Sequence, residues 1–545
     1  STYAKYDLNK YIIDAYQVPH IDVADSRILP HKDSIIRIRE EAKMRTINNA
    51  AMYANRDNKY HYIYGATFNV NGKLDFTGNG SIDYIDENKD KQTLLLTYIG
   101  VDSVFRTFGT GKIAEPDNFK LSPVYSYYGD FRVNAWRKDL TFIGNVLIAN
   151  ECNLNKPLWF KFRSEIDPNE IFIPIGYYPV DRNNDTIGSS IYVTQNPAGI
   201  YTAFLSPQKL EDDTKIVEAQ GFLHYDKKSR RYKIGTREKI LNEEVQGDLI
   251  SYHREFCNTY GEGKLNLGLD LGQVKEASYG SVSHNINSNR VTLETVSYID
   301  FFFDQGILNA ITDTLTKRPG VPGVDRTRSA FKKGITELLG NEQAKVVLDE
   351  IQLYGEVRKM PKELTHTFTF SYLDLVWDTV ASSYRSVGQI GIHSINGVPV
   401  NKMVTGYYEY AKLYTGDMFT FYFQLDDSKW FFFHYNKEEM QFISSEAGMN
   451  LALEAIKEPK RAMSVSRNEA QYKYRLSSIA FKNVFVERFT TGGGYTNIRP
   501  QLPQAPTDET KPADDTKPAD EAKPADEAKP EPENKKDADD EYEDE

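Results

Sequence analysis

The fold class follows from a pattern that recurs in Tyr60-His-Tyr-Ile-Tyr64, Gly72-Lys-Leu-Asp-Phe76 and Thr93-Leu-Leu-Leu-Thr-Tyr98. Short apolar and polar residues alternate in these runs, and Gly, Asn or Asp interrupts the pattern about every ten residues. The pattern has no helical period, and the segments leave no room for the long crossovers that parallel strands need. We therefore expect an antiparallel β-meander from Tyr53 to about Val180.

A phrase that begins with glycine recurs with variation in the first half of the chain. Glycine before an alternating triplet suits the tight turns or bulges between stacked strands, so the phrase predicts a repeat-like sheet or a series of β-sandwiches. The more conservative interpretation is chance, because the pattern is common in β-proteins. The phrases are Gly72-Lys-Leu-Asp-Phe-Thr-Gly78, Gly129-Asp-Phe-Arg-Val133, Leu140-Thr-Phe-Ile-Gly144, Gly221-Phe-Leu-His-Tyr-Asp226 and Gly263-Lys-Leu-Asn-Leu-Gly268.

The apolar period changes between Tyr298 and Gly355. Helical spacing over residues 301–315 and 330–354 predicts two helices, separated by Pro319-Gly320-Val321-Pro322-Gly323 as a candidate joint. A third helix is predicted over 447–456, capped near Ser444 or Ser445 and ending before Pro459.

Strand patterns return after Thr365. Asn396-Gly397 predicts a tight hairpin turn. Trp430-Phe-Phe-Phe-His-Tyr435 has aromatic residues on both faces, which predicts a central strand between two layers.

These patterns predict a mainly β protein, with antiparallel, repeat-like, elongated β-sheet or β-sandwich domains, a short helical insert and a disordered acidic tail. The expected segments are a lead-in at 1–52, a repeat-like β domain at 53–300, the helical insert at 301–364, a second β domain with one helix at 365–490, and the tail at 491–545.

The tail repeats Lys-Pro-Ala-Asp units between Thr507 and Glu545. Proline recurs and apolar residues are scarce, so folding would bury too little apolar surface to offset the loss of conformational entropy. The tail holds 17 acidic residues and six lysines, a net charge of −11 out of −12 for the whole chain, so the remaining body is nearly neutral. The densest basic groups of the body, such as Lys227, Lys228, Arg230 and Arg231, are short and separated by acidic residues, which argues against nucleic-acid binding.

Two cysteines, Cys152 and Cys257, are too few for a disulfide-rich scaffold or a structural zinc site. Two separate buried thiols are the favoured interpretation, and one disulfide is the alternative. Sparse cysteine suits cytoplasm, periplasm or a virion. No apolar run is long enough for a transmembrane helix, and the start at Ser1 suggests a mature or truncated chain.

The sequence contains no motif that assigns catalysis, a metal or a cofactor. The nine histidines show no metal-binding spacing. Gly109-Thr-Gly-Lys-Ile113 and Gly261-Glu-Gly-Lys-Leu265 contain Gly-Lys but lack the Ser or Thr that a phosphate-binding loop needs after lysine. Asp83, Asp86, Glu87, Asn88 and Asp90 resemble a calcium loop in composition, but a polar hairpin turn explains them better.

Two carboxylate pairs near aromatic residues could serve a glycosidase: Asp300 with Asp304, and Asp374 with Asp378. The simpler interpretation is a helix-start carboxylate at Asp304 and solvated strand residues at Asp374 and Asp378. We therefore assign no catalytic, metal-binding or cofactor-binding residue, and a non-enzymatic protein is favoured.

Several phrases resemble the large, poorly characterised β-rich envelope proteins of Bacteroidota-type bacteria, over about the first 300 residues. A more distant resemblance is to periplasmic lipid-bridge and outer-membrane assembly proteins, which implies an apolar groove. The phrases are Gly72-Lys-Leu-Asp-Phe-Thr-Gly-Asn-Gly-Ser-Ile-Asp-Tyr-Ile-Asp86, Asn118-Phe-Lys-Leu-Ser-Pro123, Leu140-Thr-Phe-Ile-Gly144, Cys152, Trp159-Phe-Lys-Phe162 and Ile166-Asp-Pro168.

The leading hypothesis is a non-enzymatic structural or assembly factor of the bacterial cell envelope, in the periplasm or at the outer membrane. Its partners would be other envelope proteins or lipid, and the acidic tail would contact a basic partner or act as a solubilising spacer. One alternative is a carbohydrate-binding or glycoside-active protein, with Trp136, Trp159 or Trp377 lining a groove. A second alternative is a structural subunit of a phage or surface appendage.

Overall fold

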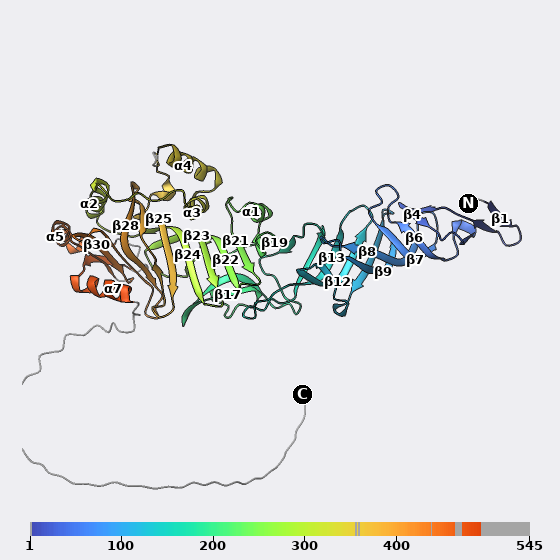
Figure 1. Ribbon diagram of the computed structural model, residues 1–545, viewed down its shortest axis with the longest axis horizontal. Helices are drawn as coiled ribbons and strands as arrows, with labels where there is room; N and C mark the ends of the chain where they lie inside the picture. Colours follow the sequence, from blue (N-terminus) through green and yellow to red (C-terminus); the bar gives the residue numbers. More distant parts are fainter. Residues whose placement is uncertain (1–2, 355–356, 358–359, 438, 464–470, 492–545) are drawn as a thin grey trace, which may run out of the picture. The chain divides into compact units, whose positions relative to one another are not determined.

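Two large sheets carry most of the chain, as the computed structural model shows (Figure 1). The structure describes residues 3–354, 357, 360–437, 439–463 and 471–491. These described residues belong to one compact unit. The predicted mainly β, antiparallel fold is confirmed, whereas the predicted acidic tail lies outside the described residues except for Thr491.

The first large sheet has 11 strands, and its spatial order follows the sequence apart from β11, which pairs with β12. The predicted meander is therefore confirmed as far as β14, whereas residues 173–175, which the prediction included, belong to the other large sheet. Its strands are β3 (Ile21–Val23), β4 (Ser26–Leu29), β6 (Ile47–Tyr53), β7 (Tyr62–Val70), β8 (Phe76–Ile85), β9 (Lys91–Val101), β10 (Thr107–Ile113), β11 (Lys120–Ser122), β12 (Tyr125–Asn134), β13 (Leu140–Ile148) and β14 (Phe160–Ile166).

Residues 1–52, the expected lead-in, already contain strands. Part of this segment forms a three-stranded sheet in the order β1-β2-β5, and the rest begins the 11-stranded sheet. The strands of the small sheet are β1 (Tyr3–Asp7), β2 (Ile12–Tyr16) and β5 (Ile35–Ile38).

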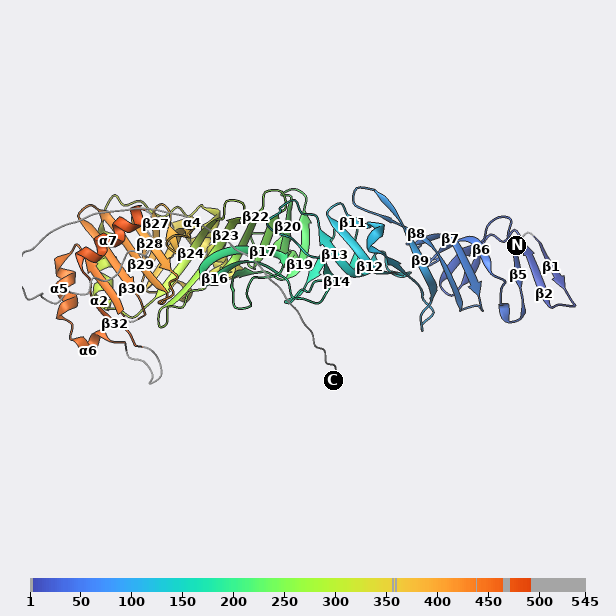
Figure 2. The same ribbon diagram turned by 90° about the horizontal axis from the view of Figure 1, so that it is seen from below.

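The second large sheet has 15 strands (Figure 2). Its neighbours β24 and β25 pair antiparallel although the helical residues lie between them in sequence. The later strands of the expected β domain at 53–300 therefore share one sheet with the expected domain at 365–490. Among the described strand pairs only β31 and β32 run parallel. The strands are β15 (Ile173–Ile175), β19 (Gly221–Asp226), β20 (Arg231–Gly235), β21 (Leu249–His253), β22 (Asn258–Leu265), β23 (Lys275–Asn285), β24 (Arg290–Asp300), β25 (Phe368–Asp378), β26 (Ser383–Ser386), β27 (Ile390–Ile395), β28 (Val398–Ala411), β29 (Met418–Asp426), β30 (Lys429–Tyr435), β31 (Glu439–Ser444) and β32 (Lys473–Leu476).

A further three-stranded sheet packs on one face of this second sheet. It has the order β17-β16-β18, with bounds β16 (Gly188–Gln195), β17 (Ala198–Ser206) and β18 (Thr214–Glu218). Thr202 on β17 lies 2.8 Å, oxygen to nitrogen, from His284 on β23. Phe204 stacks on Tyr252 of β21 with ring centroids 4.9 Å apart. These contacts make a local β-sandwich.

Helices pack on both faces of the 15-stranded sheet. Helix α2 contributes Ile307 and Ile311 to the main core, while α3 and α7 join separate clusters around Val296 and Phe432 on the opposite face. The helices are α1 (Arg237–Leu241), α2 (Gln305–Lys317), α3 (Ser329–Leu339), α4 (Asn341–Tyr354), α5 (Ala447–Ala455), α6 (Glu458–Arg461) and α7 (Ile479–Thr491).

The predicted helices are present, with shifted limits. Helix α2 begins after its N-cap residue Asp304, whose side chain accepts a hydrogen bond from the Ile307 backbone N–H. Residues 330–354 form two helices because Gly340, at a φ of 80°, ends the first. Glu446, rather than Ser444 or Ser445, occupies the N-cap position of α5, and its side chain makes no capping hydrogen bond. Helix α7 was not predicted.

Aromatic side chains fill the core between β25, β29 and β30. Phe421 stacks on Phe433 with ring centroids 4.7 Å apart, and Phe368 meets Phe421 edge to face at 5.1 Å. Phe432 precedes Phe433 in sequence but faces α7, where its ring centroid lies 5.8 Å from that of Phe485. The predicted central strand at 430–435 is thus confirmed, as is the hairpin at Asn396-Gly397, where both residues have positive φ.

A buried ion network attaches α1 and α3 to the outer face of β22. The Lys239 ammonium lies 2.7 Å from the Glu262 carboxylate, and both side chains are 2% exposed. Lys333 on α3 lies 2.6 Å from the same carboxylate. Burial disfavours the charge of Glu262, but the two lysines outweigh this effect and lower its pKa.

We expect Glu262→Leu to lower the free energy of unfolding by about 3 kcal/mol, because it leaves the buried Lys239 charge without its main partner. The double variant Glu262→Leu/Lys239→Met should recover much of this loss. Denaturant titration measures both. Asp313→Asn, which breaks an exposed pair with Lys317, is the control and should change little. Equal losses in the single and double variants would contradict the ion-network interpretation.

Candidate functional site

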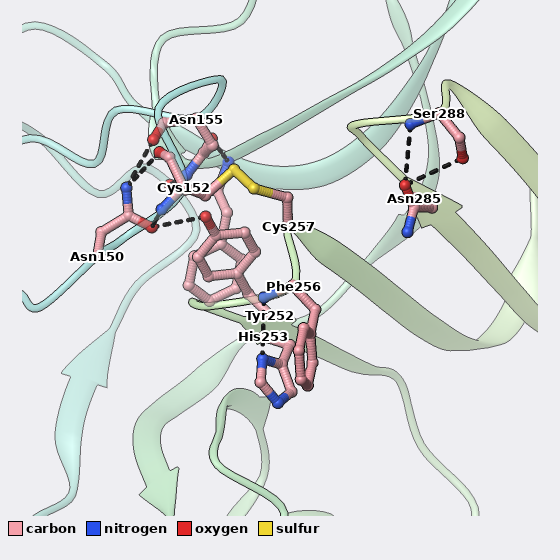
Figure 3. The surroundings of a disulfide bond; sticks show 10 residues. Asn150, Cys152, Asn155, Tyr252, His253, Phe256, Cys257, Asn285 and Ser288 are labelled. Carbon is pink, nitrogen blue, oxygen red and sulfur yellow. Dashed lines mark hydrogen bonds between the residues drawn. A yellow bond between two sulfur atoms is a disulfide. The ribbon is translucent and has the colours of Figure 1, made fainter.

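A disulfide joins the two large sheets (Figure 3). Cys152 lies in the loop after β13, and Cys257 lies in the turn between β21 and β22; their Cα atoms are 5.3 Å apart. The favoured prediction of two separate thiols is therefore wrong, and the alternative is correct. The two residues are 105 positions apart in sequence, and only the packing of the two sheets brings them together.

Tyrosine hydroxyls from the second sheet hydrogen-bond to the first sheet beside the disulfide. The buried Tyr232 hydroxyl lies 3.0 Å from the carbonyl oxygens of both Val124 and Ala149. The Tyr252 hydroxyl donates to the Asn150 side-chain oxygen at 2.6 Å (Figure 3). Burial raises the pKa of both tyrosines, so their hydroxyls remain protonated donors.

The loop that carries Cys152 is itself held by amide side chains. The Asn150 amide nitrogen donates to the carbonyl oxygens of Cys152 and Asn155, at 2.7 and 2.8 Å. The Asn155 amide in turn exchanges hydrogen bonds of 3.1 Å with the Phe204 backbone on β17. We call this set of contacts around Cys152 and Cys257 the sheet joint; it brings three sheets together.

The candidate glycosidase carboxylates all have structural partners. Asp300 accepts hydrogen bonds from His366 at 2.6 Å and from the Thr367 backbone at 2.8 Å. Burial opposes the charge of Asp300, but these partners outweigh it and lower its pKa. Asp304 caps α2, as the simpler interpretation predicts.

The second carboxylate pair is bound by arginines. Asp374 receives two hydrogen bonds from Arg328, at 2.8 and 2.9 Å. Asp378 pairs with Arg385 at 2.7 Å. The prediction that these two carboxylates are simply solvated is wrong, because each is partly buried beside an arginine.

The other candidate motifs also have structural roles. Asp86 accepts hydrogen bonds from the Asn88 and Asp90 backbones, both at 2.9 Å, in the turn between β8 and β9, which confirms the predicted polar hairpin turn. The Gly-Lys phrases at 109–113 and 261–265 lie in β10 and β22, where they pair with neighbouring strands. Within the described part of the chain, no group of three His, Cys, Asp or Glu residues could hold a metal ion.

The tryptophans named for a sugar-binding groove lie apart. Trp377 is buried and meets Tyr384 edge to face at 4.8 Å. Trp136 is covered by the Arg106 guanidinium, and Trp159 packs on Tyr128 at 4.9 Å. Each is engaged by its own local partner.

A partly buried acid that the sequence did not reveal lies at the start of β23. The Ser278 hydroxyl donates to the Glu276 carboxylate at 2.5 Å, and hydrogen bonds of 2.9 Å continue through Ser297 to Thr295 on β24. Burial raises the pKa of Glu276 to about 7, although Ser278 and Lys264 act in the opposite direction. Glu276 is therefore partly protonated near neutral pH.

Comparisons with family models, with curated proteins and with solved structures found no match for this chain. No helix in the described ranges has the length and apolar character needed to span a membrane.

Reduction of Cys152–Cys257 should lower the free energy of unfolding by about 2–5 kcal/mol, because the bridge constrains a long loop in the unfolded chain. The double variant Cys152→Ser/Cys257→Ser should show the same loss. Denaturant midpoints with and without reductant measure both, and reductant should not affect the double variant. Unchanged stability after complete reduction would contradict this role of the disulfide.

Glu276→Gln should gain stability relative to wild type as the pH rises. The folded-state pKa of about 7 exceeds the usual 4.5, so wild type loses stability between about pH 4.5 and 7 as the unfolded chain ionises first. The variant should therefore match wild type near pH 4 and exceed it by about 3 kcal/mol at pH 8, an upper value. Unfolding midpoints at both pH values test this. The exposed control Glu244→Gln should follow wild type, and parallel pH profiles for Glu276→Gln and wild type would contradict the assignment.

Proposed function

We propose that this chain is a non-enzymatic structural or assembly protein of the bacterial cell envelope, located in the periplasm or at the outer membrane. The observation that carries the proposal is the sheet joint, in which the Cys152–Cys257 disulfide links two large antiparallel sheets.

The disulfide supports a location outside the cytoplasm. Disulfides persist in oxidising compartments such as the periplasm, whereas cytosolic reductants usually keep thiols reduced. Both cysteines are buried, at 2% and 5% exposure, which is typical of a structural bridge rather than a reactive one. This argument favours the periplasm over the cytoplasm.

The engagement of polar side chains supports a structural role. Asp300, Asp374 and Asp378 are held by His366, Arg328 and Arg385, so none is an unpaired carboxylate ready for acid-base catalysis. The same pairings argue against a glycosidase role for these residues. Other envelope proteins or lipid remain the proposed partners, and a basic partner remains the proposed contact of the acidic tail.

The role as a phage or appendage subunit differs from this proposal in one measurable respect. Such a subunit assembles with copies of itself into rings or filaments. Light scattering of the purified chain that shows growth of such assemblies with concentration would favour the appendage role over the envelope role.

Cells that produce the protein should contain Cys152 and Cys257 in the oxidised form. A thiol-reactive polyethylene glycol maleimide, added to denatured lysates prepared under acid quench, should label neither cysteine before reduction and both afterwards. The protein should also fractionate with the periplasm or outer membrane. Labelling of both thiols before reduction, together with a cytoplasmic location, would overturn the proposal. The double variant Cys152→Ser/Cys257→Ser is the control for labelling.

A further inference from the structure

A cavity of about 970 Å³ opens beside β16, β18 and the end of β22. Residues 177–178 form one part of its rim, and residues 208–213 form another. The volume is at the upper end of the range of about 300–1,000 Å³ found for small-molecule sites. The cavity therefore has room for a ligand of several rings. It lies outside the sheet joint and contains none of the residues described above as candidate catalytic groups.

Two adjacent tyrosines at the rim leave their aromatic faces open. Tyr177 is 69% exposed and Tyr178 is 79% exposed. Among the described residues, neither ring stacks on another aromatic group and neither hydroxyl has a hydrogen-bond partner. Aromatic rings of this kind offer a flat apolar surface with a polar tip. Two such exposed rings in the cavity lining suit a ligand that also has flat apolar faces.

Buried side chains of β16 and β18 form part of the cavity lining. Tyr192 is fully buried and stacks in parallel on Tyr201, with ring centroids 5.1 Å apart and an interplanar angle of 11°. Ile216 and Val217 of β18 complete this buried part of the lining. The Tyr192 hydroxyl is buried without a hydrogen-bond partner in the part of the chain that the structure describes.

The loop at 208–213 is fixed in place by Tyr201. The Tyr201 hydroxyl donates to the Asp213 carboxylate at 2.6 Å and accepts a hydrogen bond from the Lys209 backbone N–H at 2.8 Å. The same carboxylate accepts a hydrogen bond from the Leu210 backbone at 3.1 Å. A wall that is already ordered lowers the entropic cost of binding a ligand.

The polar lining offers hydrogen bonds without a strong net charge. Glu211 and Gln220 line the cavity, and no side-chain partner holds either of them among the described residues. Lys215 and Glu218 neutralise each other at 2.5 Å. The lining contains four carboxylates and three lysines, so it favours neither a strongly anionic nor a strongly cationic ligand. These residues are Glu211, Asp213, Glu218, Asp248, Lys209, Lys215 and Lys264.

We propose that this cavity binds a neutral oligosaccharide, with sugar rings stacked on Tyr177 and Tyr178. The C–H faces of a sugar ring are apolar and pack on aromatic rings, while its hydroxyl groups exchange hydrogen bonds with carboxylate and amide side chains such as Glu211 and Gln220. A neutral saccharide matches the near-balanced charge, the open aromatic faces and the size of the cavity together. This recognition site does not depend on the proposed structural role.

The test is calorimetric titration of the full chain with neutral oligosaccharides: cellohexaose, maltohexaose, xylohexaose and chitohexaose. At least one should bind, and Tyr177→Ala/Tyr178→Ala should weaken that binding by about tenfold or more, through the loss of two stacking contacts. Glu211→Gln should weaken the binding less. Tyr414→Ala removes a tyrosine that is 92% exposed and does not line the cavity, so it is the matched control and should leave binding unchanged.

Three results would overturn the inference. The first is no binding heat with any of the four sugars at about millimolar concentration. A Kd of about 1 mM corresponds to a binding free energy of about −4 kcal/mol. The second is binding that the double tyrosine variant does not weaken. The third is salt-sensitive binding of the anionic polymer heparin with no binding of the neutral sugars. This result would show that the lysines of the lining, and not the tyrosines, bind the ligand. Thermal unfolding that is unchanged in both tyrosine variants ensures that lost binding reports on the site. None of these results depends on where the protein is located in the cell.

Discussion

The sheet joint is the constraint on which the arrangement of the described chain depends. Hydrogen bonds within each large sheet fix the order of its strands but do not fix the position of that sheet relative to the other. The Tyr232 and Tyr252 hydroxyls and the Cys152–Cys257 bond supply that second relation. Both tyrosines are buried, so removal of either hydroxyl leaves its acceptor with one hydrogen bond fewer in a place that water does not reach. These contacts act together with others between the two sheets, such as the Lys227–Glu87 ion pair and the Tyr125–Tyr232 ring contact.

The 15-stranded sheet illustrates how one strand can belong to two cores. Alternate residues of β30 face opposite sides, so Phe433 joins the stacked aromatic core while Phe432 packs against α7. Polar side chains follow the same division. Glu262 faces α3, where lysine side chains pair with it. Glu276 lies among serines and a threonine, and its pKa of about 7 keeps it partly protonated near neutral pH. Burial opposes the charge of both acids; the two lysines beside Glu262 outweigh this effect, whereas Ser278 and Lys264 do not outweigh it at Glu276.

Local patterns in the sequence predicted the local structure well. The alternation at 60–98, the Asn396-Gly397 turn and the aromatic run at 430–435 each correspond to strands or a hairpin, because these features depend on neighbours close in sequence. Helix α7 could have been recognised from Phe481, Phe485 and Phe489, which recur every four residues after Ser478. The disulfide, the arginine partners of Asp374 and Asp378, and the site at Tyr177 and Tyr178 could not, since each is formed by residues that only the folded sheets bring together.

The disulfide also determines how the chain would respond to mechanical tension. An antiparallel meander that is pulled from its ends can detach strand by strand, and each freed residue lengthens the chain by about 3.3–3.6 Å. Cys152 and Cys257 enclose a sequence separation of 105 residues, so the bond withholds roughly 350 Å of contour length from any such pull. A force transmitted through the backbone bypasses β14 to β21 altogether and passes through two sulfur atoms. While the bond is intact, the enclosed strands are therefore not drawn out by the pull itself, although β14 and β21 still depend on their outside neighbours β13 and β22 for pairing.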